Sequence, residues 1–110
     1  MDKIVEQGLL YDFYGELLTD HQKRIYESAV FEDLSLKELS EEYGITRQGV
    51  HDLIRRCDKT LEGYESKLHM IEKFECVKGL VKDIENESAR IDSTAGEKIR
   101  SICSNLLETL

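Results

Sequence analysis

The sequence has 110 residues, no proline and seven glycines, which is enough chain for one modest core. It predicts an all-α fold, because its abundant Leu, Glu, Lys and Ile residues favour helices. No apolar run approaches the roughly 20 residues that cross a bilayer, and the first residues lack a signal-peptide pattern. We therefore expect a cytoplasmic protein without membrane contact. The net charge of -8 excludes a uniformly basic nucleic-acid binder.

The charge is unevenly distributed along the chain. Residues 1–45 contain 4 basic and 11 acidic side chains, and residues 62–110 contain 7 and 10. Only residues 46–61 are net positive, with 4 basic and 2 acidic side chains. Local positive charge is what contacts phosphate, whereas the acidic remainder weakens long-range attraction and makes such binding sensitive to salt.

Two helices are predicted in the first third of the chain. Residues 2–18 carry apolar side chains at steps of three and four up to Leu17 and Leu18, which is typical of one helix with a broad apolar stripe. Thr19 is followed three residues later by Gln22. We therefore expect a capping box at the start of a second helix over about residues 20–31.

A short helix, a tight turn and another capped helix are predicted next. Ser35 and Glu38 form the signature of a capping box at the start of a helix over about residues 36–43. Gly44 supplies the left-handed conformation that ends this helix, and Thr46 caps the following one. That following helix is expected to bury one apolar stripe, which consists of Val50, Leu53, Ile54, Cys57 and Leu61.

The rest of the chain is predicted to be helical, with one break and one loop. A helical stripe continues over residues 64–84 for about six turns, and we expect it to be interrupted near residues 68–70 or at Gly79. Residues 86–96 are polar and small, which predicts a loop in which Thr94 caps a last helix.

These helices divide the chain into an N-terminal bundle over residues 1–62 and a C-terminal extension over residues 63–110. A four-helix N-terminal half has limited room to bury its own apolar stripe and those of the later helices. We therefore expect the extension to serve packing or dimerisation, with a homodimer favoured because most helix-turn-helix proteins gain affinity from two-fold symmetry. The alternative is that the C-terminal helices fold back and complete a monomeric core.

The string LSLKELSEEYGITRQGVHDLIRRCDKTL, which covers residues 34–61, has the spacing of a helix-turn-helix over residues 35–61. In that motif the second helix enters the major groove of DNA. Arg and Gln near the start of that helix reach guanine and adenine edges, and basic side chains further along hold phosphates. The expected roles are cap for Thr46, base reading for Arg47, Gln48 and His51, and phosphate contact for Arg55, Arg56 and Lys59.

Asp52 lies among these residues and would repel phosphate, so we expect it to pair with Arg55 or Arg56 on the same helix. The alternative interpretation of the whole string is a two-helix corner whose charged face is simply solvated. The regular spacing of cap, glycine, buried Ile45 and second cap favours the helix-turn-helix.

The same string resembles the promoter-reading fourth region of bacterial sigma factors. Their LxxLAxxxGITRxxV pattern is matched by Leu36, Leu39, Ser40, Gly44, Ile45, Thr46, Arg47 and Val50, with Ser40 in place of the common Ala. Over about residues 5–80, which include LLTDHQKRIYE and LEGYESKLHMIEKF, the chain more closely resembles the YlxM family of small bacterial helix-turn-helix proteins. The expected fold is an all-α, sigma region-four-like helix-turn-helix bundle with a long C-terminal helix and a final short helix.

The resemblance to the YlxM family implies a DNA-binding regulator. It also implies a role in the signal recognition particle pathway, because genes of this family typically neighbour those of the particle's GTPase and its receptor. The partner would then be duplex DNA. A second hypothesis is an adaptor that binds the particle's RNA or GTPase, because the acidic remainder of the chain suits a basic protein partner better than naked duplex.

We expect no enzymatic activity, because the sequence contains no phosphate-binding loop, nucleophile elbow or distinctive carboxylate pair. The histidines are scattered without ligand spacing, so neither a metal nor a cofactor is expected. Cys57, Cys76 and Cys103 contain no CxxC pair, which predicts reduced thiols that are buried or half-buried as small apolar residues.

Overall fold

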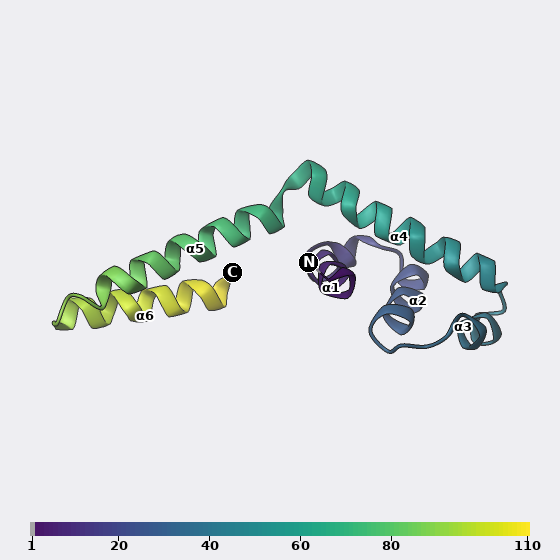
Figure 1. Ribbon diagram of the computed structural model, residues 1–110, viewed down its shortest axis with the longest axis horizontal. Helices are drawn as coiled ribbons and strands as arrows, with labels where there is room; N and C mark the ends of the chain where they lie inside the picture. The colour runs from purple at the N-terminus through teal and green to yellow at the C-terminus, as the bar shows by residue number, and fades with distance from the viewer. Residues whose placement is uncertain (1) are drawn as a thin grey trace. The chain divides into compact units, whose positions relative to one another are not determined.

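The computed structural model describes residues 2–110, and all regular secondary structure in this range is helical (Figure 1). The chain is therefore all-α, as the composition predicts. The elements are α1 (Lys3–Tyr14), a 3-10 turn η1 (Gly15–Leu17), α2 (Asp20–Val30), α3 (Leu36–Tyr43), α4 (Arg47–Leu68), α5 (Met70–Ser88) and α6 (Thr94–Thr109).

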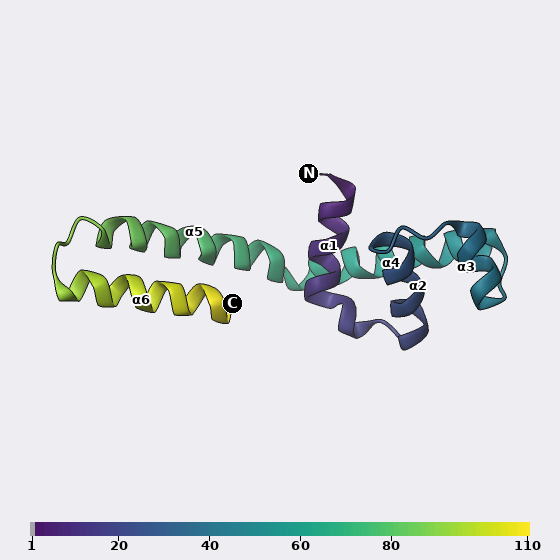
Figure 2. The same ribbon diagram turned by 90° about the horizontal axis from the view of Figure 1, so that it is seen from below.

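The chain forms two compact units, Met1–His69 and Met70–Leu110. The N-terminal unit contains α1 to α4, and the C-terminal unit is the hairpin of α5 and α6, which run side by side in opposite directions (Figure 2). The boundary expected after residue 62 lies inside α4, because this helix continues through Gly63 to Leu68. The break comes at His69, which has a left-handed backbone with φ 53°.

The N-terminal unit has a core at the junction of α2, α3 and α4. Ile25, Leu39 and Val50 each contribute a fully buried side chain, one from each helix. Partly buried apolar residues surround them: Ala29, Leu34, Tyr43, Ile45, Leu53 and Ile54. On α4, Cys57 and Leu61 continue the buried stripe. The predicted inner face of α4 therefore packs inward, with Leu53 and Ile54 only half-buried.

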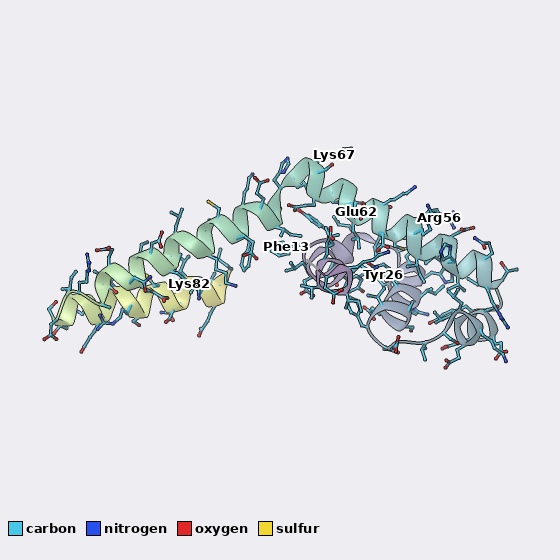
Figure 3. All side chains as sticks on the ribbon, viewed as in Figure 1. Phe13, Tyr26, Arg56, Glu62, Lys67 and Lys82 are labelled. Carbon is cyan, nitrogen blue, oxygen red and sulfur yellow. The ribbon has the colours of Figure 1, made fainter. Side chains whose placement is uncertain are left out.

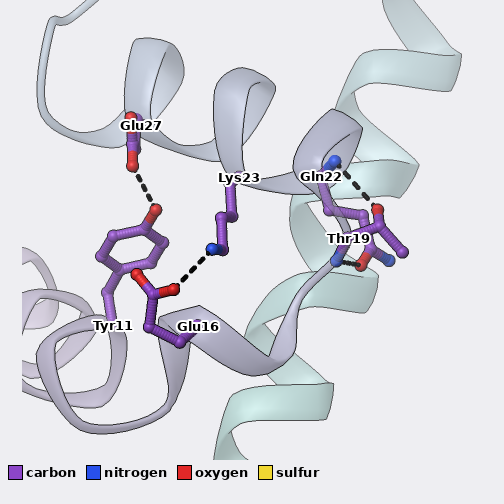
Figure 4. Close-up of polar contacts among 6 residues, drawn as sticks. All are labelled: Tyr11, Glu16, Thr19, Gln22, Lys23 and Glu27. Carbon is purple, nitrogen blue, oxygen red and sulfur yellow. Dashed lines mark hydrogen bonds and ion pairs between the residues drawn. The ribbon is translucent and has the colours of Figure 1, made fainter.

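Helix α1 is joined to the bundle by tyrosine hydroxyls that donate to carboxylates. The Tyr14 hydroxyl donates to Glu65 of α4 at 2.5 Å, and the Tyr11 hydroxyl donates to Glu27 of α2 (Figure 4). Burial, followed by the bond to Glu27, raises the pKa of Tyr11 well above its usual value. These bonds attach α1 to two helices. Each tyrosine places its apolar ring in the interior and its hydroxyl against a charged acceptor at the edge of the bundle.

Local capping signals are confirmed in the N-terminal unit. The Thr19 hydroxyl accepts from the Gln22 amide at 3.2 Å and the Gln22 side chain accepts from the Thr19 amide at 2.9 Å, which completes the capping box of α2 (Figure 4). Ser35 and Glu38 form the same reciprocal pair at the start of α3. These contacts span three residues, so they depend little on the rest of the fold.

The first predicted helix is too long by one turn. Helix α1 ends at Tyr14, and Gly15–Leu17 continue as the 3-10 turn that leads to Thr19. As a result Leu18 is buried but Leu17 is 58% exposed. The tighter winding of a 3-10 turn moves side chains away from the α-helical stripe, so the periodicity used for the prediction fails there.

The loop predicted over residues 86–96 is wrong at both ends. Helix α5 extends to Ser88 and α6 begins at Thr94, so only residues 89–93 connect them. Ser93 rather than Thr94 is the cap, because Ser93 has an extended backbone and its hydroxyl accepts from the Gly96 amide at 3.3 Å. Of the two predicted break points, the one at residues 68–70 is confirmed, and α5 passes through Gly79 without interruption.

The three cysteines are free thiols in different environments. Cys57 and Cys103 are buried, as expected, whereas Cys76 is exposed on α5. The expectation of a buried or half-buried thiol is therefore wrong for Cys76. Within residues 2–110, the structure contains no helix that is long and apolar enough to span a membrane.

Candidate nucleic-acid interface

The turn between α3 and α4 is held by three local features. Gly44 has a left-handed backbone with φ 66°, which ends α3 at the predicted position. The Ser40 hydroxyl donates to the carbonyl of Ile45, so a side chain of α3 braces the turn. The Thr46 hydroxyl accepts from the Gly49 amide at 2.9 Å and caps α4. Helix α4 therefore begins at a defined angle to α3.

Gly49 leaves room for this cap. A Cβ at position 49 would lie 3.1 Å from the Thr46 hydroxyl oxygen, which is tighter than an ordinary contact. The sequence alone indicates no role for a glycine in the first turn of a helix, where glycine weakens helix formation by about 1 kcal/mol relative to alanine. Because a larger residue at position 49 would crowd the Thr46 cap, glycine fits this position despite its cost to the helix.

All seven residues predicted for the interface are exposed, and they lie on or next to one helix. Thr46 caps α4, and the other six lie in its first four turns: Arg47, Gln48, His51, Arg55, Arg56 and Lys59. Four residues of α4 line an open hollow of about 330 Å³: Asp52, Arg55, Arg56 and Lys59. Figure 3 shows Arg56 on the exposed side of α4. The predicted phosphate contacts therefore share one surface.

A second hollow extends this surface onto α2. Arg56 and Lys59 line its α4 side, and Thr19, His21 and Gln22 line its other side at the start of α2, with a volume of about 550 Å³. Sequence reasoning missed these α2 residues, because no local pattern indicates that the start of α2 lies beside the middle of α4. The hollow therefore extends from Arg56 and Lys59 to the N-terminus of α2, where the helix dipole favours anions and Asp20 in the first turn opposes them.

Asp52 does not pair with an arginine as predicted. Its carboxylate accepts a hydrogen bond from the Gln48 side-chain amide at 2.9 Å, and it lies 3.7 Å from Nδ1 of His51. Gln48 precedes Asp52 by one turn on the same face, so its side-chain amide reaches the carboxylate. Arg55 and Arg56 follow Asp52 at the same kind of spacing, and nothing in the structure explains why they do not pair with it. Two of the three predicted base-reading side chains therefore lie against an acidic group.

The basic side chains of this surface are available for a ligand. Within residues 2–110, the structure gives no ion pair to Arg47, Arg55, Arg56 or Lys59. Arg55 and Lys59 are one turn apart, so they present adjacent positive charges along the helix. Unpaired cations on an exposed helix face are suited to phosphate oxygens, which accept from guanidinium and ammonium groups.

The opposite side of α4 is locked to the bundle by a polar cluster. Asp58 accepts from the Tyr26 hydroxyl at 2.6 Å and from the Gln7 amide at 3.0 Å, so it joins α4 to α2 and α1. Burial, followed by the bond to Asp58, raises the pKa of Tyr26 far above its usual value. Beside this cluster, burial raises the pKa of the Cys57 thiol from 9.0 to about 11. The side of α4 that faces away from the basic residues is thus bonded to α1 and α2.

These features define the class of the protein. A short helix with a capping box, a left-handed glycine, a braced turn and a second capped helix with an exposed basic face make a helix-turn-helix protein. The chain belongs to the UPF0122 family, which is described as "Putative helix-turn-helix protein, YlxM / p13 like" and matches residues 1–102. The predicted family is confirmed.

Relatives of this family resemble the chain over most or part of its length. A UPF0122 protein of Shouchella clausii is 34% identical over 110 residues, which cover all of this chain and 95% of the relative. A UPF0122 protein of Streptococcus gordonii is 36% identical over 104 residues, or 94% of each chain. A third, from Desulforamulus reducens, is 50% identical over 67 residues, which cover 61% of this chain and 57% of the relative.

Proposed function

We propose that the protein is a cytoplasmic, non-enzymatic regulator that binds duplex DNA through α4 and requires no cofactor. The observation that carries the proposal is the set of four unpaired basic side chains on the exposed face of a capped helix in a helix-turn-helix. They are Arg47, Arg55, Arg56 and Lys59. The rest of the sequence is acidic, so this face is where an anionic polymer is attracted rather than repelled.

The proposed roles follow from position along α4. The first turn, behind the Thr46 cap, enters the major groove, where Arg47, Gln48 and His51 reach base edges. Arg55, Arg56 and Lys59 lie one and two turns further on and contact the phosphates that flank the groove. The start of α2 adds a phosphate contact beside Arg56 and Lys59, at the second hollow.

The experiment is a titration of the full chain against labelled random duplex at about 50 mM and 200 mM salt, a range over which several phosphate contacts reduce affinity strongly. We expect salt-sensitive binding by the wild type. The double variant Arg47→Ala, Arg55→Ala should retain its helical circular dichroism and lose binding. Normal binding by this variant would contradict the assignment.

A matched control separates the interface from net charge. The variant Lys82→Ala, Lys98→Ala removes two positive charges from exposed sites on α5 and α6, which are not part of the helix-turn-helix. It should bind DNA as the wild type does. An equal loss in both double variants would mean that overall charge, rather than the face of α4, determines binding.

Asp52 provides a second control that acts in the opposite direction. Replacing Asp52 by Asn removes a negative charge from the middle of the interface and keeps the shape of the side chain. We expect DNA affinity to rise about threefold to tenfold, which corresponds to roughly 1 kcal/mol. Reduced affinity would mean that Asp52 is itself a DNA contact, for example to a cytosine amino group.

The alternative function is an adaptor of the signal recognition particle that binds its RNA or its GTPase. The observation that favours it is the excess of acidic side chains outside residues 46–61, because an acidic surface suits a basic protein partner. The same titration with the particle's RNA, and a pull-down with its GTPase, distinguish the two functions. Retained RNA or GTPase binding without duplex binding supports the adaptor, and retention of neither contradicts it.

A further inference from the structure

A third hollow of the N-terminal unit lies between α1 and the end of α2. Five residues line its volume of about 320 Å³: Tyr11 and Asp12 from α1, Glu27 from α2, and Phe31 and Glu32 directly after α2. We call it the aromatic hollow. It shares no lining residue with the two hollows beside α4, so a ligand here contacts different side chains from those of the proposed DNA interface.

Two of the lining residues are aromatic, and the fold holds their rings in place. The ring centroids of Tyr11 and Phe31 lie 5.3 Å apart at a tilt of 58°, and Tyr11 also stacks on the buried Tyr26 at 5.6 Å. A Cβ at Gly8 would lie 3.9 Å from the Phe31 ring, so this ring lies against α1 where that helix has no side chain. Phe31 nevertheless remains 44% exposed. An exposed ring that lines a hollow offers a surface on which a flat or cationic group can stack.

The other three lining residues are carboxylates without a cation. Within residues 2–110, the structure gives no ion pair to Asp12, Glu27 or Glu32. Glu27 accepts a hydrogen bond from the Tyr11 hydroxyl, which is neutral (Figure 4). Lys23 precedes Glu27 by one turn, but its ammonium pairs with Glu16 at 2.9 Å instead (Figure 4). The negative charge around the two rings is therefore not balanced by the chain itself.

We propose that the aromatic hollow binds an arginine side chain in a basic segment of a partner protein. A guanidinium group suits both parts of the hollow, because it stacks on an aromatic ring and donates two parallel hydrogen bonds to a carboxylate. Lysine supplies the charge but neither the plane nor the paired donors. The inference rests on neither of the functions proposed above, because it concerns lining residues that neither of them uses.

The charges of the aromatic hollow favour a protein segment over other cationic or anionic partners. Three carboxylates repel phosphate, which argues against a nucleic acid at this surface. Asp33 follows Glu32 directly and is exposed, so the acidic surface continues beyond the hollow. A single small cation would leave most of these charges unbalanced. A segment with several basic residues can place one arginine in the hollow and others along its acidic edge.

The test is a fluorescence anisotropy titration of the full chain at about 50 mM salt, where charge contacts are weakly screened. The probe is a labelled peptide of alternating Arg and Gly, compared with a peptide of the same length that has Lys in place of Arg. We expect the Arg peptide to bind about threefold more tightly. The amide shifts that it causes in NMR spectra should cluster at residues 8–12 and 27–32. No binding of the Arg peptide at about 1 mM protein overturns the proposal.

A pair of charge-matched variants separates the hollow from the net charge of the chain. Asp12→Asn, Glu32→Gln removes two lining charges at exposed positions and keeps the shape of both side chains. We expect the Arg peptide to bind about tenfold more weakly. Asp83→Asn, Glu75→Gln removes the same charges from exposed positions on α5 that do not line the hollow. This variant should bind as the wild type does, and an equal loss in both variants overturns the proposal.

Phe31→Leu tests the aromatic part without changing the charge. It keeps an apolar side chain at this position, so the helical circular dichroism should be retained, and the preference for the Arg peptide over the Lys peptide should disappear. An unchanged preference would overturn the role of the ring. Spermidine that displaces the peptide from the hollow at equal concentration would assign the site to a small polyamine and overturn the protein partner. Duplex binding is a separate measurement, so its failure leaves these results unaffected.

Discussion

The two units of the chain solve the problem of burying apolar stripes in different ways. In the N-terminal unit, α4 packs against α1, α2 and α3, and residues from three helices meet with no exposure at Ile25, Leu39 and Val50. In the C-terminal unit, two helices pack against each other, and several large apolar side chains remain exposed, among them Leu80, Ile84 and Ile102. A bundle of several helices buries its own core, whereas a hairpin of two helices leaves part of its apolar surface exposed.

The comparison is tested most strongly by removing a central side chain of the N-terminal unit. Ile25→Ala deletes a fully buried side chain from the core, and we expect the free energy of unfolding to fall by about 4 kcal/mol. Chemical denaturation followed by circular dichroism measures the change. Ile4→Ala, at a position that is 61% exposed, is the matched control and should change stability by no more than about 0.5 kcal/mol. Similar losses in both variants would contradict the described core.

In the C-terminal unit, we expect the largest loss of stability from a substitution at the turn rather than in a core. A Cβ at Gly96 would lie 2.4 Å from the carbonyl oxygen of Ile91, and 3.1 Å from that of Ser88, to which Arg100 donates at 2.9 Å. Both contacts are to backbone atoms, so we expect Gly96→Ala to destabilise the hairpin by about 3 kcal/mol. Hydrogen exchange of the α5 and α6 amides measures this loss.

The control for the hairpin turn is another glycine of the same unit. A Cβ at Gly79 meets nothing within 4 Å, so Gly79→Ala should stabilise α5 by about 0.5 to 1 kcal/mol through helix propensity. If Gly96→Ala left amide protection in α5 and α6 unchanged, the close approach at the turn would not hold the hairpin together.

The polar supports of the N-terminal unit should contribute less than its core. Tyr26→Phe removes the hydroxyl that donates to Asp58 and leaves that half-buried carboxylate with the Gln7 amide. We expect a loss of about 2 kcal/mol, since hydrogen bonds to charged groups are stronger than neutral ones. Tyr64→Phe should have almost no effect, because Tyr64 contributes a ring contact to Tyr14 at 5.9 Å rather than a described hydroxyl bond. Equal losses of stability in the two variants would mean that the Tyr26 hydroxyl bond to Asp58 contributes nothing of its own.

The smallest expected effect is the response of the N-terminal unit to alkaline pH. The Cys57 thiol has a pKa of about 11 in the fold against 9.0 ordinarily, so the unfolded chain loses this proton first. Its contribution is therefore fully present below pH 9 and is lost as pH rises toward 11, by up to about 1 kcal/mol per pH unit. Denaturation midpoints between pH 8 and 9.5 measure the slope below the ordinary tyrosine pKa of 10.0, where the raised pKa values of Tyr11 and Tyr26 contribute little, and Cys57→Ala should flatten it there. A wild type whose stability rises over this range contradicts the assignment.

Predictions from sequence succeeded where the physical cause is local. Four features depend only on residues within about four positions of one another. They are the capping boxes at Thr19 and Ser35, the left-handed backbone of Gly44 and the Thr46 cap. The family assignment and the all-α class follow from the same kind of signal. Local chemistry therefore predicts where most helices of the N-terminal unit begin.

The errors occurred where a local pattern allows more than one outcome, or where neighbours in space decide the outcome. The exposed Leu17 follows from a 3-10 turn, and the Ser93 cap follows from the backbone of a short connection. The hollow beside His21 requires the packing of α2 against α4, which no short pattern encodes. For the interface itself, the positions of the basic residues on one helix were predictable, but the choice of Gln48 over an arginine as the partner of Asp52 was not.

The bond between Gln48 and Asp52 has a consequence for discrimination among sequences. Under the proposed mode of binding, the Gln48 amide must leave a carboxylate at 2.9 Å before it reaches a base. An adenine that offers Gln48 two hydrogen bonds replaces the lost one, whereas other bases leave Asp52 without a donor close to a negatively charged backbone. Asp52 therefore weakens binding to the many non-matching sites of a genome more than binding to the matching site. It increases the ratio of the two affinities by lowering the affinity for non-matching DNA.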